Sequence, residues 1–366
     1  MGKPFKKPLN TLKKHGVMGG LLPLRGGGER TKGIFPKKSG ALLFAYCRLF
    51  LLGLVVVALG AIAPAFAAET YPSRPVRFVV PFPPGAGTDT TARLIAQRLS
   101  ERLGQQFIVE NKPGAGTNLG TEVVINAAPD GYTLLLVSPA NAINPALYRR
   151  LAFNFRRDIV PVAAIMRVPN VMDVTPSLPV RTVAEFIAYA KAHPGRINMA
   201  SSGIGTSVHL SGELFKAMAG IDIVHVPYRG SAPALTDVIG GQVDVIFNNM
   251  PSSIGLVQSG KIRALAVTTA ERSQLWPDVP TVGETIPGYE ASAWYGMGAP
   301  KGTPGEVVAT LNRAVNEALA DPRLAARLTE LGGTLLPGSP GDFARLIDEE
   351  TDKWGKLVAS LGLKVD

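Results

Sequence analysis

Apolar residues follow two alternating patterns along residues 71–361. Short runs rich in Val, Ile and Leu predict buried strands, and apolar residues at a helical spacing predict amphipathic helices. In the first part of this stretch, strands are expected at Val76–Pro81, Phe107–Glu110, Leu134–Val137 and Val162–Met166, and helices at Thr90–Leu103 and Leu119–Ala128. Alternation of strands with helices predicts a mostly parallel sheet that is flanked by helices.

A second series of the same kind begins near Val171. Its expected strands are Asn198–Ser201, Ile223–Val226, Val243–Phe247 and Ala264–Val267, and its expected helices are Val183–Ala192, Ser207–Met218 and Pro233–Ile239. The proline-containing segment Ser273–Tyr289 lacks periodicity and is predicted to be a surface connection. A strand at Ala293–Ala299 and helices at Pro304–Leu319, Pro322–Leu331 and Asp342–Leu361 complete the pattern. A chain of this length predicts two domains.

The first 67 residues are predicted to be an export signal rather than part of the fold. A basic, glycine-rich stretch precedes the apolar run Leu49–Ala63, and Ala65-Phe66-Ala67 follows it. This order is typical of a secretory signal peptide, here with cleavage near Ala67. The run of 15 residues is shorter than the ~20 that cross a bilayer as a helix. We therefore expect a periplasmic protein, with an uncleaved N-terminal anchor as the alternative.

The charge balance changes once this leader is set aside. Of the 38 Lys and Arg and the 28 Asp and Glu residues, 11 and one lie in residues 1–67, which leaves 27 of each in the remainder. A nucleic-acid-binding domain needs a basic face, so we expect no nucleic-acid partner. The one cysteine, Cys47, lies in the leader, so the exported chain has no disulfide, thiolate metal site or cysteine nucleophile. No metal and no cofactor are expected.

The tetrapeptide Gly-x-Gly-Thr occurs three times, each time ahead of a stretch with helical spacing. The copies are Gly85–Thr88, Gly114–Thr117 and Gly203–Thr206. Glycine allows a tight turn and a close approach of the backbone, and a helix N-terminus presents unpaired N–H groups to an anion. Since each copy follows an expected strand, all three should lie at the edge of the sheet where ligands bind. An ordinary strand-to-helix turn, capped by Thr88 or Asp89, is the alternative for the first copy, and a purely structural role is an equal alternative for the second.

Few other residues in the sequence suggest a functional role. His209 follows the third copy and either faces a ligand or packs in the core, and we favour packing. His193 and His225 lack the spacing of metal ligands and are expected near the surface. No Gly-x-Ser-x-Gly elbow or His-Glu-x-x-His pair occurs, so binding is expected rather than catalysis.

Taken in order, these motifs resemble the solute-binding proteins of tripartite tricarboxylate transporters, the Bug family. The resemblance covers the chain from Tyr71 to the C-terminus. It is carried by Tyr71–Pro75, Val80–Asp89, Glu110–Gly116, Pro129–Thr133, Ile143–Pro145, Ser201–Leu210, Val226–Gly230, Gly240–Asp244, Pro277–Thr281 and Trp294–Gly296.

The resemblance implies a type II-like periplasmic binding-protein fold, with two α/β domains joined by two hinge crossovers. By position, residues 68–170 and 292–366 would form domain 1, and 171–291 domain 2. One wall of the ligand site would contain Phe82, Gly85, Ala86, Gly87, Thr88 and Asp89. The other wall would contain Ser202, Gly205, Thr206, Ser207 and His209. Ser138 and Asn141, in the loop after the third strand, would add polar contacts, and Tyr228 and Asn248 are further candidates.

Two departures from the family pattern are expected to matter differently. Many relatives have aspartate where Asn248 stands. We therefore expect the protein to contact the end of the ligand away from its carboxylate in a different way from these relatives. Ala86, where relatives often have glycine, should be tolerated unless its φ is positive.

The resemblance therefore implies a monomeric protein that captures a small organic carboxylate and delivers it to the membrane subunits of a transporter. A ligand sensor of the same fold and an exported α/β enzyme are the alternatives. Which carboxylate binds is left open.

Overall fold

The computed structural model describes residue 46 and residues 48–52 and 71–365. Residues 46 and 48–52 are helical and exposed, while Cys47 and the expected cleavage position near Ala67 lie outside the described residues. In the described part of the chain, no helix combines the length and the apolar character that a membrane crossing needs. Residues 71–365 lie in one compact unit, which carries the fold.

One half of the sheet contains the strands that come first in the chain. Its order is β2-β1-β3-β9-β4, with β10 paired to the outer side of β4. The bounds are β1 Val76–Val80, β2 Phe107–Asn111, β3 Thr133–Val137, β4 Ile159–Val174, β9 Ser292–Pro300 and β10 Thr334–Leu335. Every residue of β3 and β9 is buried, as continuous apolar runs predict for strands that are covered on both faces.

The other half continues from the second part of β4 in the order β4-β7-β5-β6, with β8 on the opposite side of β4. Its bounds are β5 Asn198–Ser201, β6 Val224–Pro227, β7 Val245–Asn249 and β8 Arg263–Val267. β4 is continuous through both halves, and its partners change between Pro169, which pairs with β9, and Asn170, which pairs with β7.

The sheet is mixed, which differs from the mostly parallel sheet that the sequence predicts. The ladders β1–β2, β1–β3, β5–β6 and β5–β7 are parallel. All pairings of β4 and β9 are antiparallel. The reason is that β4 runs from the first half into the second and β9 follows the return of the chain to the first half, so neither strand follows the strand–helix–strand path that produces parallel neighbours.

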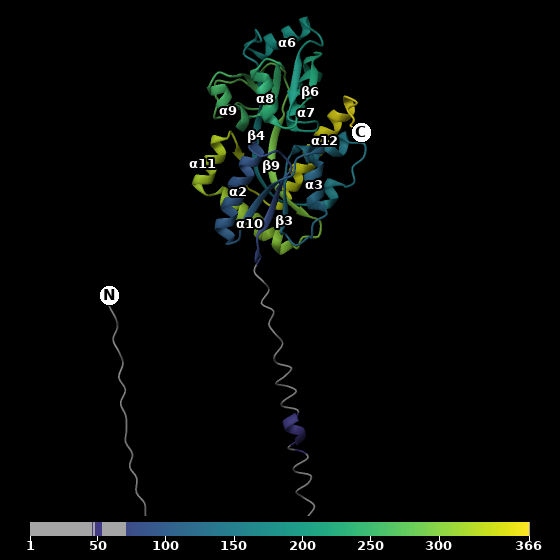
Figure 1. Ribbon diagram of the computed structural model, residues 1–366, viewed down its shortest axis with the longest axis vertical. Coiled ribbons are helices and arrows are strands. Elements are labelled where there is room, and N and C mark those ends of the chain that lie inside the picture. The colour runs from purple at the N-terminus through teal and green to yellow at the C-terminus, as the bar shows by residue number, and fades with distance from the viewer. Residues whose placement is uncertain (1–45, 47, 53–70, 366) are drawn as a thin grey trace, which may run out of the picture. The chain divides into compact units, whose positions relative to one another are not determined.

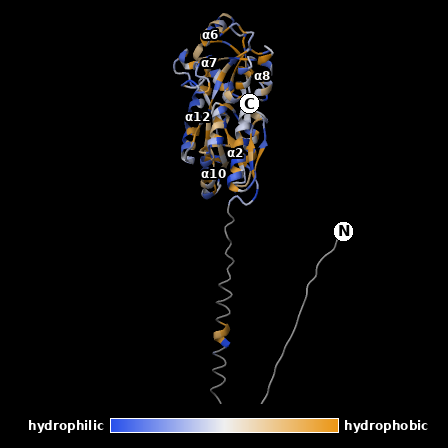
Figure 2. Cartoon of the chain, turned by 90° about the vertical axis from the view of Figure 1, so that its left-hand side faces the viewer, coloured by the Kyte–Doolittle hydropathy of each residue, from blue (hydrophilic) through white to orange (hydrophobic). Residues whose placement is uncertain are grey.

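Helices surround each half, with β4 and β9 running between the two groups (Figure 1). Those of the first half are α2 Gly87–Leu103, α3 Asn118–Ile125, α4 Pro139–Leu147, α5 Phe155–Asp158, α10 Gly305–Leu319, α11 Pro322–Glu330 and α12 Pro340–Ser360. Those of the second are α6 Val183–Ala192, α7 Ser207–Ala219, α8 Ser231–Ile239 and α9 Met250–Gln258. Short 3-10 turns occupy η1 Ala115–Thr117 and η2 Val282–Glu284. α2, α10 and α12 carry both hydrophilic and hydrophobic residues, as amphipathic helices should (Figure 2).

The apolar core is joined across the two halves by α4 and α12. Leu147 of α4 and Trp354 of α12 belong to the same buried cluster as Met172, Phe215 and Phe247 of the second half. A separate cluster packs α2 and α10 against β1, β3, β4 and β9. The end of α12 therefore packs with the second half even though the chain enters it from the first.

Two differences from the sequence prediction concern segments with proline. The sequence analysis did not identify α4 or α9, and the structure places Pro145 inside α4 and Pro251 near the start of α9. The expected surface connection Ser273–Tyr289 is in fact partly buried, with Val282 and Tyr289 in the core. Tertiary contacts override the weak local pattern in both cases.

Candidate functional site

A cleft of about 670 Å³ lies at the edge of the sheet where β1, β2, β5 and β6 end. It is lined by four separate segments of the chain and by Tyr148. These parts are Pro81–Pro83, Pro113–Thr117, Ser202–Ile204 with Thr206, and Pro227–Gly230. Residues of the second and third Gly-x-Gly-Thr copies and the approach to the first thus meet in one cavity.

The first copy is braced by the carboxylate of Asp89. Asp89 accepts hydrogen bonds from the Gly85 N–H, from Arg93 and from Asn111, each at 2.9 Å. Burial alone would raise the pKa of Asp89, but the hydrogen bonds from Arg93, Gly85 and Asn111 outweigh it and lower the pKa. The carboxylate is therefore ionised and its oxygens are occupied by the protein.

Neither Thr88 nor Asp89 caps α2. The N-cap residue is Ala86, without a side-chain cap, at φ −76°, so alanine is unstrained at this position. Gly87 is buried against Pro251 of the other half, and a Cβ on it would lie 2.8 Å from the Pro251 Cβ. The buried hydroxyl of Thr88 has no hydrogen-bond partner among the described residues, which leaves a donor available at the start of α2.

The second copy has a strained backbone. Ala115 and Thr117 have positive φ values of 47° and 82°, which cost a non-glycine residue ~1–3 kcal/mol each. The buried Thr117 hydroxyl, like that of Thr88, has no partner among the described residues. Strain together with an unpaired buried donor in a cleft is a typical sign of a ligand site.

Asn144 of α4 joins the second and third copies. Its amide nitrogen donates to the carbonyl of Gly116 and to Asn118, both at 2.7 Å. Its Oδ1 would lie 2.4 Å from a Cβ on Gly205 and has no partner among the described residues. The sequence analysis named Asn144 within the motif Ile143–Pro145 but gave it no role in the site, because only the contact between two distant turns reveals its position.

The third copy starts α7. Thr206 is the N-cap residue: its hydroxyl donates to the Gly203 carbonyl at 2.7 Å and accepts from the His209 N–H at 3.3 Å. Ser202 donates to the Thr206 hydroxyl at 3.3 Å. Ser207 is buried behind Thr206 and accepts a hydrogen bond from Asn249 at 3.2 Å. Ser202 and Thr206 line the cleft, whereas Gly205 and Ser207 lie behind it.

His209 is a packed histidine. Its ring stacks on that of His225 at 4.1 Å, and its Nδ1 faces the Gly205 N–H at 3.3 Å. Burial, together with the neighbouring His225 and Lys216, lowers the pKa of His209 to about 3. Burial, with Lys216, lowers that of His225 to about 4. Both rings are neutral at pH 7, and the expectation of a surface role for His225 was wrong.

Glu213 and the two rings present donor atoms within 4.8 Å of one another, which is a possible metal-ligand set. Protein groups already engage at least one donor atom of each of these residues. Lys216 pairs with Glu213 at 3.3 Å, His225 Nε2 lies 2.7 Å from the Ser201 hydroxyl, and Gly205 donates to His209. The arrangement is explained by packing beneath the third copy.

Ser138 and Asn141 do not lie in a loop, as the sequence analysis expected. They are the N-cap and N3 residues of α4 and form a capping box. Asn141 also donates to Thr121 at 2.9 Å, and both residues are buried. Neither lines the cleft.

Asn248 also lies behind the cleft. It accepts from Ser231 at 2.9 Å and donates to Ser253 at 3.0 Å, and Ser253 in turn donates to the buried carboxyl of Asp173. Tyr228 does line the cleft, with its hydroxyl bound to Asp237 at 2.6 Å. Burial, the hydrogen bond to Asp237 and its negative charge raise the pKa of Tyr228 to about 12.

Arg229 is the only residue with a charged side chain among those that line the cleft. It is exposed. Arg229, Gly230 and Pro83 also line a groove of about 520 Å³ that continues past Gly85 and Ala86. The cleft therefore offers one positive charge, no acidic side chain and two helix N-termini close by, which favours an anion.

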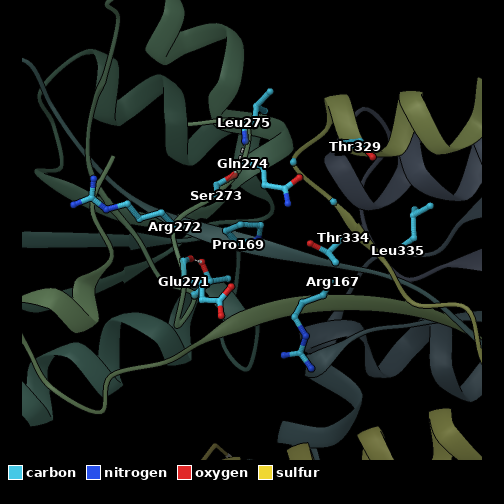
Figure 3. A pocket seen from close by; sticks show the side chains of 13 residues that line it. Arg167, Pro169, Glu271, Arg272, Ser273, Gln274, Leu275, Thr329, Thr334 and Leu335 are labelled. Carbon is cyan, nitrogen blue, oxygen red and sulfur yellow. Dashed lines mark hydrogen bonds between the residues drawn. The ribbon is translucent and has the colours of Figure 1, made fainter. Parts of the chain in front are cut away.

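Another cavity, of about 450 Å³, lies at the opposite edge of β4, between the loops that follow β8 and precede β10. Gln274 and Thr334 lie toward its centre, and Arg272 points away from them (Figure 3). Its arginines are engaged, since Arg167 donates to Ser292 and Arg272 pairs with Glu284, both at 2.7 Å. It contains no residue of the three glycine segments, so the first cleft is the better candidate.

The chain matches the model of the family described as "Tripartite tricarboxylate transporter family receptor" over residues 91–363. Protein BugT of Bordetella pertussis (strain Tohama I) is 37% identical over 320 residues, which cover 87% of this chain and 98% of that protein.

Two solved structures resemble the chain along their whole length. "R. palustris Rpa4515 with adipate" has a TM-score of 0.78 and 42% identity, covering 81% of this chain and 100% of that one. "Structure of periplasmic binding protein BugD" has a TM-score of 0.77 and 35% identity, with the same coverage of 81% and 100%.

Proposed function

Because this chain belongs to the tripartite tricarboxylate transporter receptor family and has the α/β fold of a periplasmic binding protein, we propose that its cleft binds a small organic carboxylate. We further propose that it delivers this ligand to the membrane subunits of a transporter. The observation that carries the proposal is that the second and third glycine segments line one cleft without acidic residues, while Gly85 and Ala86 of the first line the groove that continues from it. The adipate named for the related Rpa4515 structure supports the same class of ligand.

The ligand would contact the residues that line the cleft. Of the predicted site residues these are Phe82, Ser202, Thr206 and Tyr228. Thr88 lines neither the cleft nor the groove, but we assign its unpaired hydroxyl to the same role, because a buried donor without a partner is costly unless a ligand or water satisfies it. The other predicted residues would act by shaping the walls: Gly85, Ala86, Gly87, Asp89, Ser138, Asn141, Gly205, Ser207, His209 and Asn248.

We propose that residues 68–170 with 292–366 and residues 171–291 act as two domains that close on the ligand. The change of β4 partners between Pro169 and Asn170, and the start of β9 at Ser292, support these boundaries. Binding that uses N–H groups from both domains favours the closed form over the open one.

We also propose that the first 67 residues direct export to the periplasm and are removed near Ala67, and that the exported protein works as a monomer without nucleic acid. The order of basic and apolar segments in the sequence supports export.

Calorimetric titration with mono-, di- and tricarboxylates tests the proposal. The purified protein is first unfolded and refolded, so that no carried ligand remains. We expect one class of acid to bind at one site per chain and to reduce the radius of gyration in X-ray scattering. Absence of binding across all three classes, or mass-spectrometric detection of a converted acid, would contradict it.

A further inference from the structure

The side chain of Arg229 makes no polar interaction with the described part of the protein. It is exposed, and within the described residues no hydrogen bond or ion pair holds it. Other arginines near the cleft differ in this respect: Arg93 pairs with Asp89 at 2.9 Å. An arginine with free donors at the wall of a cavity that contains no other charge is available to a ligand.

The backbone around Arg229 is fixed on the same wall as the third glycine segment. The N–H of Tyr228 donates to the Ser201 carbonyl at 3.0 Å, and the N–H of Gly230 donates to the Ser202 carbonyl at 3.1 Å. A Cβ on Gly230 would lie 3.1 Å from Pro83 of the opposite wall. The Arg229 backbone is therefore held beside the start of α7, at a point where the two walls meet.

The helix starts and Arg229 offer two different kinds of anion partner. N–H groups and hydroxyls at a helix start suit one carboxylate. A second carboxylate in the same cleft would find no other positive side chain among the lining residues. Guanidinium binds a carboxylate through two parallel hydrogen bonds, which makes Arg a selective partner for it.

We propose that Arg229 pairs with a second carboxylate of the ligand and thereby selects dicarboxylates over monocarboxylates of equal length. This inference depends on the proposed function of the cleft. A monocarboxylate leaves the exposed guanidinium in water at no cost, so Arg229 adds affinity only for ligands with two acid groups.

The test compares straight-chain dicarboxylates from succinate to suberate with the monocarboxylate of the same carbon number. Affinities are measured by calorimetry for the wild type, for Arg229→Gln and for Arg196→Gln. Arg196 is exposed, belongs to the second half and does not line the cleft, so it controls for the loss of one positive charge.

Removing a charge-assisted hydrogen-bonded pair is expected to weaken the best dicarboxylate about 10- to 100-fold in Arg229→Gln. The monocarboxylate affinity should be unchanged in this variant, and Arg196→Gln should resemble the wild type for both ligands. An equal loss for both ligands in Arg229→Gln, or no loss, would overturn the role of Arg229.

Failure of this inference can be told apart from failure of the proposed function. If the wild type binds monocarboxylates as tightly as dicarboxylates, the selection by Arg229 is wrong while carboxylate binding stands. If the wild type binds neither kind of acid, both proposals are wrong.

Discussion

Gly116 lies so close to Ile204 that a Cβ on Gly116 would be 2.8 Å from the Ile204 carbonyl oxygen. The two residues belong to different glycine segments, one on each wall of the cleft. The Tyr148 hydroxyl would be nearer still to that Cβ, at 2.5 Å. Glycine is thus required at position 116 by the approach of the opposite wall as well as by its φ of 59°.

Replacing Gly116 with alanine should impair closure. The positive φ alone costs ~1–2 kcal/mol in an alanine, and the added methyl group would keep the two walls apart. We expect a loss of carboxylate affinity in calorimetry that exceeds what the loss of stability explains. The free energy of unfolding is measured in urea alongside.

Gly220→Ala is a matched control, because Gly220 has a φ of 60° and no atom within 4 Å of the added Cβ. It should lose a similar amount of stability and keep its affinity. If both variants bind carboxylate equally well, the contact between Gly116 and Ile204 has no part in closure.

Two substitutions of Thr206 can separate its role as the N-cap of α7 from its proposed contact with the ligand. Thr206→Ala removes the N-cap hydroxyl of α7 and should lower the free energy of unfolding by ~1 kcal/mol, while Thr206→Ser keeps the hydroxyl and should be nearly neutral. If the hydroxyl only caps the helix, the alanine variant will still bind carboxylate normally under conditions where it is fully folded. A loss of affinity in the folded alanine variant supports direct contact with the ligand.

Asp173 should make the stability depend on pH. It is wholly buried, and burial raises the pKa of its carboxyl well above the usual range, against the hydrogen bond from Ser253. Because the pKa is higher in the folded state, the neutral carboxyl stabilises the fold fully at low pH. This contribution is lost as the pH rises through the folded-state value.

Asp173→Asn should therefore gain stability relative to the wild type as the pH increases from 5 toward 8, by at most ~1.4 kcal/mol per pH unit. Urea unfolding at several pH values measures this difference, and the histidines cancel because both proteins contain them. A constant difference between Asp173→Asn and the wild type would show that Asp173 is ionised in both states.

Much of the fold could be predicted because its pattern is local. The strand prediction Asn198–Ser201 and the helix prediction Val183–Ala192 coincide with β5 and α6, since apolar period and helix-cap residues act over a few positions. Helices α4 and α9 were missed, because their prolines weaken the local pattern and contacts with other elements stabilise them.

The candidate site was predictable in its backbone and less so in its side chains. The glycine segments predict turns at helix starts, and residues from all three line the cleft or the groove that continues from it. The side chains of Asp89 and Asn248 turn toward partners such as Arg93 and Ser231, and no spacing in the sequence indicates this. Which way a side chain faces depends on residues that are distant in the chain.

The sequence by itself determined the alternation of strands and helices, the three glycine-rich turns and the lack of net charge beyond residue 67, because these follow from local backbone preferences and composition. Only the tertiary structure decided that Gly116 meets Ile204, that His209 stacks on His225 and that Arg229 is the cation of the cleft. Those relationships join residues that are adjacent only after the sheet has formed, and so no local pattern contains them.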